Sequence, residues 1–265
     1  MQTTTSRTPN LQRSLRPDRV MGRIDGTLAF PAAFGAVSDP GPTLALPVLP
    51  VLPELPVLPV LRLRDVGVGD TCLSLSAYAG EIVHLVGGSA MAQLRVLAMA
   101  AGFGPCGSGR CEVLGHDLQE LDDAQRRTLR ERHVARVLAC DHLPEAASVL
   151  AAVALPLVRQ GVALADARAR AELELDALGA GHLAPQRPAT LTRPEARWVL
   201  LARALVTRPR LLVLEQPETD LPPAAVSSVR LALWALSSAF GACVLMSTGH
   251  PRLMASADRR VDLDR

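Results

Sequence analysis

Residues 83–95, VHLVGGSAMAQLR, combine an apolar run, a pair of glycines and a stretch of helix-forming residues. This order is typical of a phosphate-binding loop, GxxxxGK[ST], whose backbone N–H groups surround phosphates. Here Ala92, Gln93 and Leu94 stand where that motif has its last glycine, its lysine and its hydroxyl residue. Gln93 can donate a hydrogen bond but brings no charge, and Leu94 has no oxygen for Mg²⁺. The segment therefore has the outline of a phosphate loop without its cation and its metal-binding hydroxyl.

The segments that must position this loop alternate between strand and helix patterns from Leu61 onward. LRLRDV and CLSLSA alternate as half-buried strands do, and EIVHLVGG, LLVLEQP and ACVLMST are apolar runs of buried strands. The spacing predicts a charged helix from Asp122 to His133, a helical region at about 148–208 and a long helix in PPAAVSSVRLALWALSSAFG. Such alternation predicts an α/β fold with a parallel sheet covered on both faces.

Residues 1–60 differ in composition and pattern from the rest of the chain and are expected to form an N-terminal extension. The first 43 residues are rich in Thr, Ser, Arg, Pro and Gly without periodicity, which predicts disorder. Within the Pro-rich segment 42–60, a proline recurs at every third position from Pro47 to Pro59, which excludes a helix and fits polyproline II. We interpret this segment as a linker or as sequence upstream of the true start; a PxxP-type ligand or a stiff spacer is the alternative.

Charge and cysteine content narrow the classes of partner. The 28 basic residues are all arginines and nearly balance 26 acidic residues, with both signs interleaved in DDAQRRTLRERH. Such stretches are typical of solvated helix faces, so nothing predicts nucleic-acid binding. Of the five cysteines only Cys106 and Cys111 are close in sequence, which favours reduced thiols over a metal site. No apolar stretch is long enough for a membrane helix, and export is not expected.

One apparent motif is rejected on its context. GFGPCG at 102–107 matches the GxGxxG pattern of dinucleotide-binding loops. It follows a helix pattern rather than a strand, and no strand, helix and strand unit is centred on it. Dinucleotide binding is therefore not expected.

The order of the segments carries a resemblance over about three quarters of the chain. AGEIVHLVG, EVLGHDLQEL, HLPEAASVLAAVALPLV, ARALVTRPRLLVLEQP and HPRLMASADRRVDL resemble the ATP-binding cassette (ABC) ATPase domain of ABC transporters. The similarity is strongest to the subfamily that serves lipoprotein release, macrolide export and cell division. It implies a P-loop NTPase fold over residues 61–265, with a central mostly parallel sheet, a small β subdomain and a helical subdomain at about 140–207.

The same resemblance implies a function and a location. Its members bind ATP and Mg²⁺, form cassette homodimers or heterodimers, and attach to a permease subunit at the membrane. It therefore implies a cytoplasmic protein, peripheral at the inner face of the cell membrane. ATP and Mg²⁺ are the expected cofactors, but binding is expected to be weak because the motifs are altered.

The phosphate-loop position keeps only part of the family pattern. Ala90 replaces a glycine, and Gln93 stands in place of a lysine whose charge-assisted hydrogen bonds are worth about 1.5 to 3 kcal/mol each. We therefore expect roughly ten- to hundredfold weaker nucleotide binding. The resemblance assigns the following residues to nucleotide binding: Gly87, Gly88, Ser89, Ala90, Ala92, Gln93 and Leu94.

The catalytic pair after the strand LLVL is altered as well. Family members place Asp and then Glu there, the first to support Mg²⁺ and the second to polarise the attacking water. This chain has Glu215 and Gln216. Glu215 keeps a carboxylate and stays a candidate Mg²⁺ ligand, whereas Gln216 is neutral and cannot act as a general base.

The remaining family positions have changed too. The signature LSGGQ falls on LTRPE at 191–195, which keeps a hydroxyl at Thr192 but adds bulk and a negative charge. The switch histidine aligns with Gly249, and His250 follows one position later. We interpret His250 as a loop histidine without a catalytic role; a displaced switch is the alternative. The Q-loop glutamine aligns with Ala139, the aspartate that couples the two sites of a dimer aligns with Pro222, and the adenine-stacking aromatic is missing from GVGDT.

Three hypotheses follow, and the first is preferred. A cassette-fold pseudo-ATPase would keep the architecture and the surface that docks a membrane subunit, but would hydrolyse ATP weakly or not at all. An active ATP-binding subunit, driving export or lipoprotein release, is the alternative. The third is a non-enzymatic interaction platform that uses its Pro-rich arm.

Overall fold

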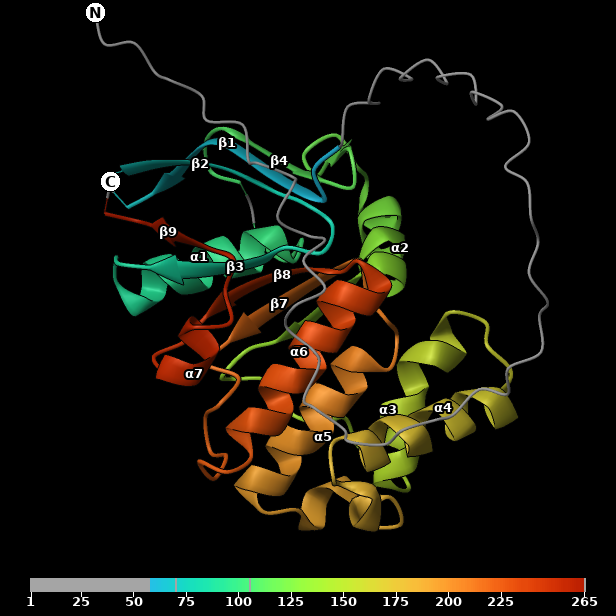
Figure 1. Ribbon diagram of the computed structural model, residues 1–265. Helices are drawn as coiled ribbons and strands as arrows, with labels where there is room; N and C mark the ends of the chain where they lie inside the picture. Colours follow the sequence, from blue (N-terminus) through green and yellow to red (C-terminus); the bar gives the residue numbers. More distant parts are fainter. Residues whose placement is uncertain (1–57, 70, 105, 265) are drawn as a thin grey trace, which may run out of the picture. The chain divides into compact units, whose positions relative to one another are not determined.

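The computed structural model describes residues 58–264 except residues 70 and 105 (Figure 1). Most of the predicted N-terminal extension, with its proline triplets, lies outside the described residues. Its last residue, Val60, is buried, and the Val60 backbone N–H donates to the carbonyl of Ala77 at 2.8 Å. The part of the chain described here is therefore ordered as a domain from at least residue 60.

A five-stranded parallel sheet forms the centre of this domain. Strands β7 and β8 are fully covered, because successive side chains of β7 enter two different apolar cores. Leu212 and Leu214 enter a core shared with helices α3 to α6, the helix-side core, whereas Leu211 and Val213 enter a core shared with α1 and a second sheet, the sheet-side core. This confirms the predicted parallel sheet covered on both faces. Its strand order is β6 (Val134–Val137), β7 (Leu211–Glu215), β8 (Cys243–Ser247), β3 (Ile82–Val86) and β9 (Arg259–Asp262).

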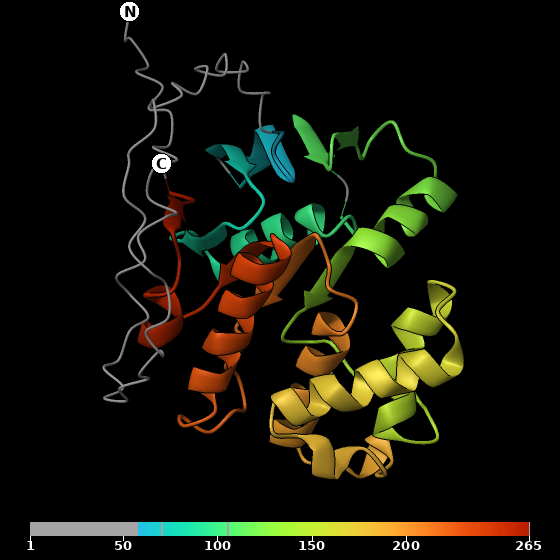
Figure 2. The same cartoon turned by 45° about the vertical axis from the view of Figure 1, so that its right-hand side comes forward.

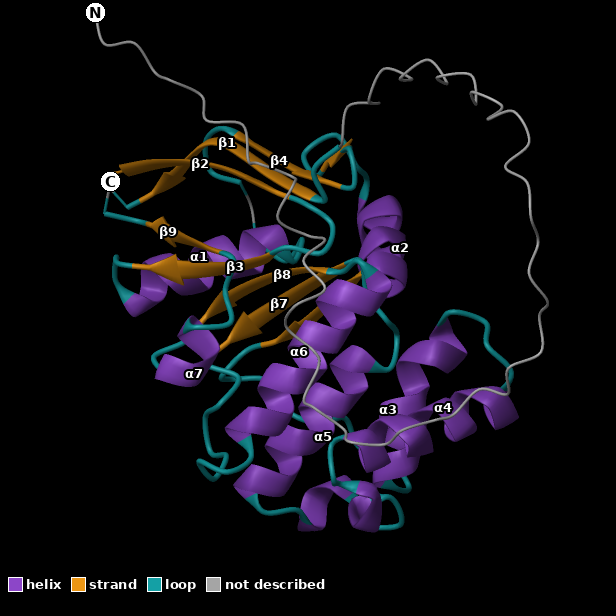
Figure 3. Cartoon of the chain, in the orientation of Figure 1, coloured by secondary structure: helices purple, strands orange, loops and turns teal. Residues whose placement is uncertain are grey.

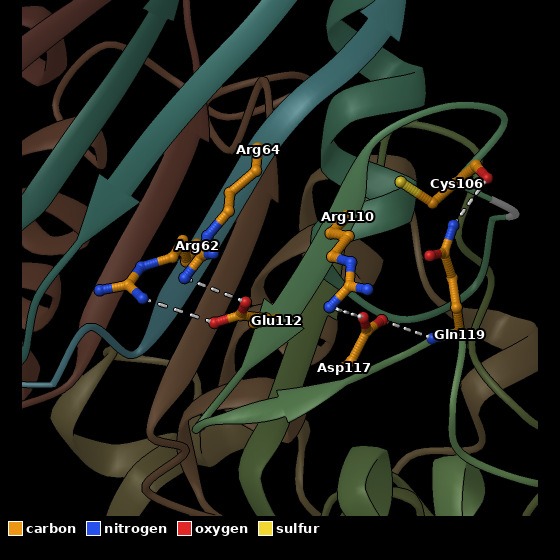
Figure 4. Close-up of polar contacts among 7 residues, drawn as sticks. All are labelled: Arg62, Arg64, Cys106, Arg110, Glu112, Asp117 and Gln119. Carbon is orange, nitrogen blue, oxygen red and sulfur yellow. Dashed lines mark hydrogen bonds and ion pairs between the residues drawn. The ribbon is translucent and has the colours of Figure 1, made fainter.

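The second sheet is antiparallel and corresponds to the expected small β subdomain. Its apolar residues, such as Leu61 and Leu63, alternate with exposed ones and enter the sheet-side core. On its other face Glu112 lies between Arg62 and Arg64, at 3.7 and 3.4 Å (Figure 4). These partly exposed pairs contribute little stability individually. The strand order is β2 (Thr71–Ala77), β1 (Leu61–Val68), β4 (Arg110–Val113) and β5 (His116–Asp117).

Polar side chains begin several of the helices that cover the sheets. The Ser89 and Ser148 hydroxyls accept hydrogen bonds from backbone N–H groups three residues on, and Asp122 forms a capping box with Gln125. Such caps satisfy N–H groups that have no partner inside the helix. Helix α6 ends at Gly241, which has the left-handed φ of 65° that glycine tolerates. The helices are α1 (Ala90–Ala100), α2 (Asp123–His133), α3 (Val149–Arg159), α4 (Leu164–Ala177), α5 (Arg193–Leu205), α6 (Val226–Phe240) and α7 (Pro251–Met254).

The helices divide between the two cores. Helix α1 contacts β1 and β4 on one side and β7 and β8 on the other, so it lies between the two sheets (Figure 3). Helix α3 packs on α4 and α5, and these form the helical part of the domain (Figure 2). The short 3-10 segments Gly181–Leu183 and Pro188–Thr190 connect α4 to α5. The GFGPCG stretch begins in the turn after α1, which agrees with the rejection of a dinucleotide-binding loop.

Candidate functional site

The phosphate-loop position forms the turn between β3 and α1. Gly87 and Gly88 have φ values of 68° and 64°, a conformation that favours glycine. Ser89 then caps α1, its hydroxyl accepting from the Ala92 N–H at 3.1 Å. The Gln93 side-chain amide donates to the Gly87 carbonyl at 2.8 Å, so it closes back onto its own loop. The turn joins a buried strand to a capped helix, as a phosphate loop does, while the residue in the lysine position is hydrogen-bonded within the turn.

Two carboxylates from the end of the chain lie beside this turn. A Cβ added at Gly87 would overlap the Asp262 carboxylate and come within 2.7 Å of Asp264 Oδ2. A Cβ at Gly88 would lie 3.1 Å from the Leu263 Cβ. The segment after β9 is therefore packed against the loop and brings negative charge to it, which opposes a phosphate. The acidic ending DLDR was the only signal in the sequence, and it did not indicate this proximity.

Glu215, the candidate Mg²⁺ ligand, lies at the end of β7 and is half-buried. Its Oε2 accepts a hydrogen bond from the backbone N–H of Ala139 at 2.9 Å. The structure thus brings together two positions that the family alignment singled out separately. A charge-assisted hydrogen bond of this kind stabilises the carboxylate in place. The carboxylate keeps lone pairs on both oxygens that could contact a metal ion.

Gln216 adopts a backbone conformation that is unusual for a side-chain-bearing residue. Its φ is 42°, and its N–H donates to the Ser247 carbonyl of the neighbouring strand at 2.8 Å. Its exposed side-chain oxygen receives only a long contact, 3.4 Å, from the Thr219 hydroxyl. Residues in such sparsely populated conformations are concentrated at functional sites. Position 216 therefore has a backbone conformation that is common at functional sites, although its side chain is a neutral amide.

Arg197, on α5, organises the same region and was not found by sequence reasoning. It is 4 % exposed, and its two terminal nitrogens donate to the carbonyls of Leu138, Glu215 and Gln216 at 2.9, 2.7 and 2.6 Å. Burial lowers the pKa of the Arg197 guanidinium, and nearby carboxylates, Asp220 first, counteract this shift. The guanidinium ties helix α5 to the ends of β6 and β7. A single arginine in a run of helix-forming residues gives no sign of this role.

A second unforeseen contact joins the ends of β7 and β8. Glu218 Oε1 accepts from the Thr248 hydroxyl at 2.7 Å and from the Gly249 N–H at 3.1 Å. His84, buried on β3, contacts the Thr248 carbonyl through Nε2 at 3.0 Å. Burial lowers the pKa of His84 despite the Thr248 carbonyl and Glu218, which raise it. Gly249, which aligns with the family's switch histidine, is thus hydrogen-bonded to the Glu218 carboxylate.

The signature position is also engaged within the chain. Thr192 precedes α5, and both its N–H and its hydroxyl donate to Glu195 Oε2, at 2.8 and 2.7 Å. These hydrogen bonds, the hydroxyl's first, lower the pKa of Glu195. The N-terminus of a helix favours an anion, and here the helix's own carboxylate takes that place. Thr192 is therefore used as a helix cap rather than left open toward a ligand.

His250 has a structural contact of its own. It precedes α7, where its Nδ1 accepts from the Arg252 N–H at 3.2 Å, while its backbone N–H donates to the Thr248 hydroxyl at 3.1 Å. The imidazole thus caps a helix of four residues. The interpretation of His250 as a loop histidine without a catalytic role stays a prediction.

A cavity of about 660 Å³ opens next to this region, between residues 139–146 and the start of α5. Asp141, Arg193 and Arg197 contribute charges of both signs to its lining. Asp141 is fixed in place, since it accepts from the Leu138 N–H at 2.8 Å and pairs with Arg136 at 3.2 Å. The cavity is large enough for a small ligand or for a few side chains of another protein.

The residues present fit ATP and Mg²⁺ only in part. The loop backbone is suitable, but positions 93 and 94 supply neither a cation nor a hydroxyl. Among the described residues, no group of three or more His, Cys, Asp or Glu side chains is arranged to hold a metal ion. Glu215 remains the residue that would contact Mg²⁺ bound to a nucleotide.

Comparisons with known proteins agree on the family. The "ABC transporter" family model matches residues 71–219. The "Lipoprotein-releasing system ATP-binding protein LolD" of Ruegeria sp. (strain TM1040) is 33% identical over 192 residues, which cover 72% of this chain and 85% of that protein. The "Uncharacterized ABC transporter ATP-binding protein YbbA" of Escherichia coli (strain K12) is 31% identical over 202 residues, covering 74% and 89%.

A solved structure shows the same fold at lower identity. The bacterial ABC transporter cassette MJ0796, solved as a dimer, superimposes with a TM-score of 0.71 at 21% identity over 77% of this chain and 94% of its own. Within the described part of the chain, no helix is both long and apolar enough to cross a membrane. The family match over more than half of the chain, the two curated relatives and the cassette fold together show that this chain belongs to the ABC transporter family, as an ATP-binding subunit similar to LolD.

Proposed function

We propose that this chain is the ATP-binding-cassette subunit of an ABC transporter in which ATP binding is weak and hydrolysis is lost or severely impaired. The observation that carries the proposal is the hydrogen bond from the Gln93 side chain to the Gly87 carbonyl, at 2.8 Å. A neutral amide that closes onto its own loop replaces the lysine that would neutralise phosphate charge. Losing that charged contact weakens nucleotide binding by roughly ten- to hundredfold.

The anion-binding positions around the site support the same proposal. Glu195 is hydrogen-bonded at the start of α5, Glu218 at the turn after β8, and Asp264 lies beside Gly87. Each of these carboxylates brings negative charge where the family binds phosphate. A nucleotide would have to displace them or bear their repulsion, which is strongest at the part-buried Glu218.

The proposal also rests on the absence of a base at position 216. An amide cannot take the proton from an attacking water, and general-base catalysis is worth about 10² to 10⁴ in rate. Glu215 precedes position 216 and is hydrogen-bonded to the Ala139 N–H, and Glu218, the next carboxylate after it, accepts two hydrogen bonds at Oε1 from Thr248 and Gly249. We infer that hydrolysis is slow even when nucleotide is bound.

We further propose that the chain acts beside a membrane. Its relatives are named as ATP-binding proteins of a lipoprotein-releasing system, and the cassette of known structure is a dimer. By analogy this chain is cytoplasmic, associates with a permease subunit at the inner face of the membrane, and pairs with a second cassette. The cavity next to residues 139–146 is a candidate docking surface for that permease.

An active subunit is the second candidate, favoured by the names of the relatives and by the carboxylate retained at Glu215. ATPase assays of the purified protein at saturating Mg²⁺-ATP separate the two. We expect no turnover above background, and we expect the double variant Gln93→Lys/Gln216→Glu to stay inactive because Glu195 and Glu218 remain. Turnover by the unmodified protein, abolished by Glu215→Gln, would establish the active subunit instead.

A further inference from the structure

A second pocket lies away from the phosphate loop, where helix α7 meets helix α6 (Figure 1). Its volume is about 360 Å³, and the Arg252 guanidinium, from α7, donates to the Ser227 hydroxyl of α6 at 3.1 Å. That hydrogen bond fixes one wall relative to the other. The pocket is lined by Ser227, Arg230, Arg252, Ala255 and Ser256.

The charge of this pocket is of one sign. Helices α6 and α7 contain Arg230 and Arg252 but no Asp or Glu, and the flanking carboxylates, Asp220 and Asp258, do not line the pocket. Neither arginine forms an ion pair within the described part of the chain, although arginines elsewhere in the domain do. Two guanidinium groups and the Ser227 hydroxyl therefore line one small cavity without a carboxylate from α6 or α7, whereas the Ser256 hydroxyl donates to the Leu253 carbonyl at 2.6 Å.

We propose that this α6–α7 pocket binds a phosphate group, carried either by a free phosphate ester or by a phospholipid headgroup. Arginine is well suited to phosphate because its planar fork donates two parallel hydrogen bonds, and the Ser227 hydroxyl, which accepts from Arg252, keeps its own hydrogen for a further bond. The volume lies at the lower end of the range for small-molecule pockets, which suits a small charged group.

The surface next to the pocket is apolar. Trp234 stands one helical turn after Arg230 and is 57 % exposed, and the neighbouring Leu231 is 55 % exposed. A ligand whose phosphate is held by Arg230 can therefore extend its uncharged part over Trp234. The pocket contrasts with the phosphate-loop position, where Asp262 and Asp264 oppose an anion. This proposal does not depend on the loss of ATP hydrolysis.

The test uses the full-length protein without nucleotide and has two arms. Inorganic phosphate is titrated in a calorimeter, and vesicles of phosphatidylglycerol are compared with vesicles of phosphatidylcholine by co-sedimentation. The variant Arg230→Gln/Arg252→Gln removes both charges from exposed positions, so we expect it to fold. The matched control, Arg168→Gln/Arg170→Gln, removes two exposed charges from α4.

We expect saturable binding in at least one arm, weakened about tenfold or more in the α6–α7 variant and unchanged in the α4 variant. Binding of phosphate alone identifies a free phosphate ester, and binding of anionic vesicles alone identifies a headgroup. Absence of binding in both arms overturns the proposal. Binding that survives in the α6–α7 variant also overturns it, because the ligand would then sit elsewhere, as at the phosphate loop.

Discussion

Some residues in this protein make structural contacts that the surrounding sequence does not predict. Arg197 is one arginine among several on α5, yet it is the one whose guanidinium is buried against three backbone carbonyls. Those carbonyls belong to Leu138, which follows β6, to Glu215, the last residue of β7, and to Gln216, which follows it. The residue therefore supports the site geometry around Glu215 and Gln216 rather than a ligand.

Replacing Arg197 tests this supporting role. The variant Arg197→Met keeps the apolar stem but leaves the carbonyls of Leu138, Glu215 and Gln216 without their donor. We expect the free energy of unfolding to fall by about 2 to 4 kcal/mol, measured by urea denaturation. Arg193→Gln, at an exposed position of the same helix, serves as control and should change stability by less than about 0.5 kcal/mol. An equal effect of both substitutions would refute the supporting role.

His84 gives the protein a predictable dependence on pH. Burial lowers the pKa of His84 below that of a histidine in the unfolded chain, about 6.5, and Arg260 acts in the same direction. The unfolded state therefore binds the proton more readily, so stability is complete above pH 6.5 and decreases as the pH falls below it. One such group contributes at most about 1.4 kcal/mol per pH unit.

The variant His84→Gln isolates this contribution. We expect the loss of stability between pH 7 and pH 5 to become shallower than in the unmodified protein, as followed by urea denaturation at each pH. The exposed His182→Gln serves as control and should leave the slope as it is. An unchanged slope in His84→Gln would mean that other groups, such as His133, whose pKa burial also lowers, account for the pH dependence.

For single residues, the sequence showed which motif residues had been replaced, but it did not predict side-chain contacts between distant segments. Gln93, Leu94 and Gln216 could be recognised as altered because a motif defines what should stand there. The contacts of Arg197 and Glu218 span loops that come together only when β6, β7 and β8 pair side by side. No local sequence pattern predicts contacts between such distant loops, so the roles of Arg197 and Glu218 were not predicted.

At the scale of elements, the turn from β3 to α1 shows which local rules were sufficient. The apolar run, the glycine pair and the helix-forming stretch predicted this strand, turn and helix, and the structure has them at Ile82–Val86 and Ala90–Ala100. Its helix begins with a serine cap although the ligand-binding side chains have changed. The element is thus kept by backbone and capping preferences that do not require a nucleotide.

Removing that cap should weaken the element. In Ser89→Ala the Ala92 N–H loses its hydrogen-bond acceptor, and we expect the free energy of unfolding to fall by about 1 kcal/mol. Ser238→Ala, at an exposed position near the end of α6, should change it by less than about 0.5 kcal/mol. Circular dichroism during chemical denaturation measures both. If Ser89→Ala were as stable as the unmodified protein, water would replace the cap fully, and the Ser89 hydroxyl would not contribute to the stability of the turn.

At the scale of the whole domain, the parallel sheet links two apolar cores. Alternate residues of β7 and of β8 enter the helix-side core and the sheet-side core, so both strands contribute to each core. The strand and helix pattern predicted a sheet covered on both faces. It did not predict which residues of the strands would enter each of the two cores. That division depends on the crossing order β6, β7, β8, β3, β9, which is a property of the assembled sheet.

Two buried cysteines allow the cooperativity of this arrangement to be measured. Cys111 lies on β4 of the antiparallel sheet and Cys243 on β8 of the parallel sheet, yet both belong to the sheet-side core. Burial raises the pKa of each thiol to about 12, so both should resist a maleimide near neutral pH until the protein unfolds. In a variant with Cys72, Cys106 and Cys140 replaced by serine, labelling is followed by mass spectrometry across a urea series. Because one core spans both sheets, we expect Cys111 and Cys243 to reach half-labelling at the same urea concentration. Earlier labelling of Cys111 would show instead that the antiparallel sheet unfolds separately while the parallel sheet persists.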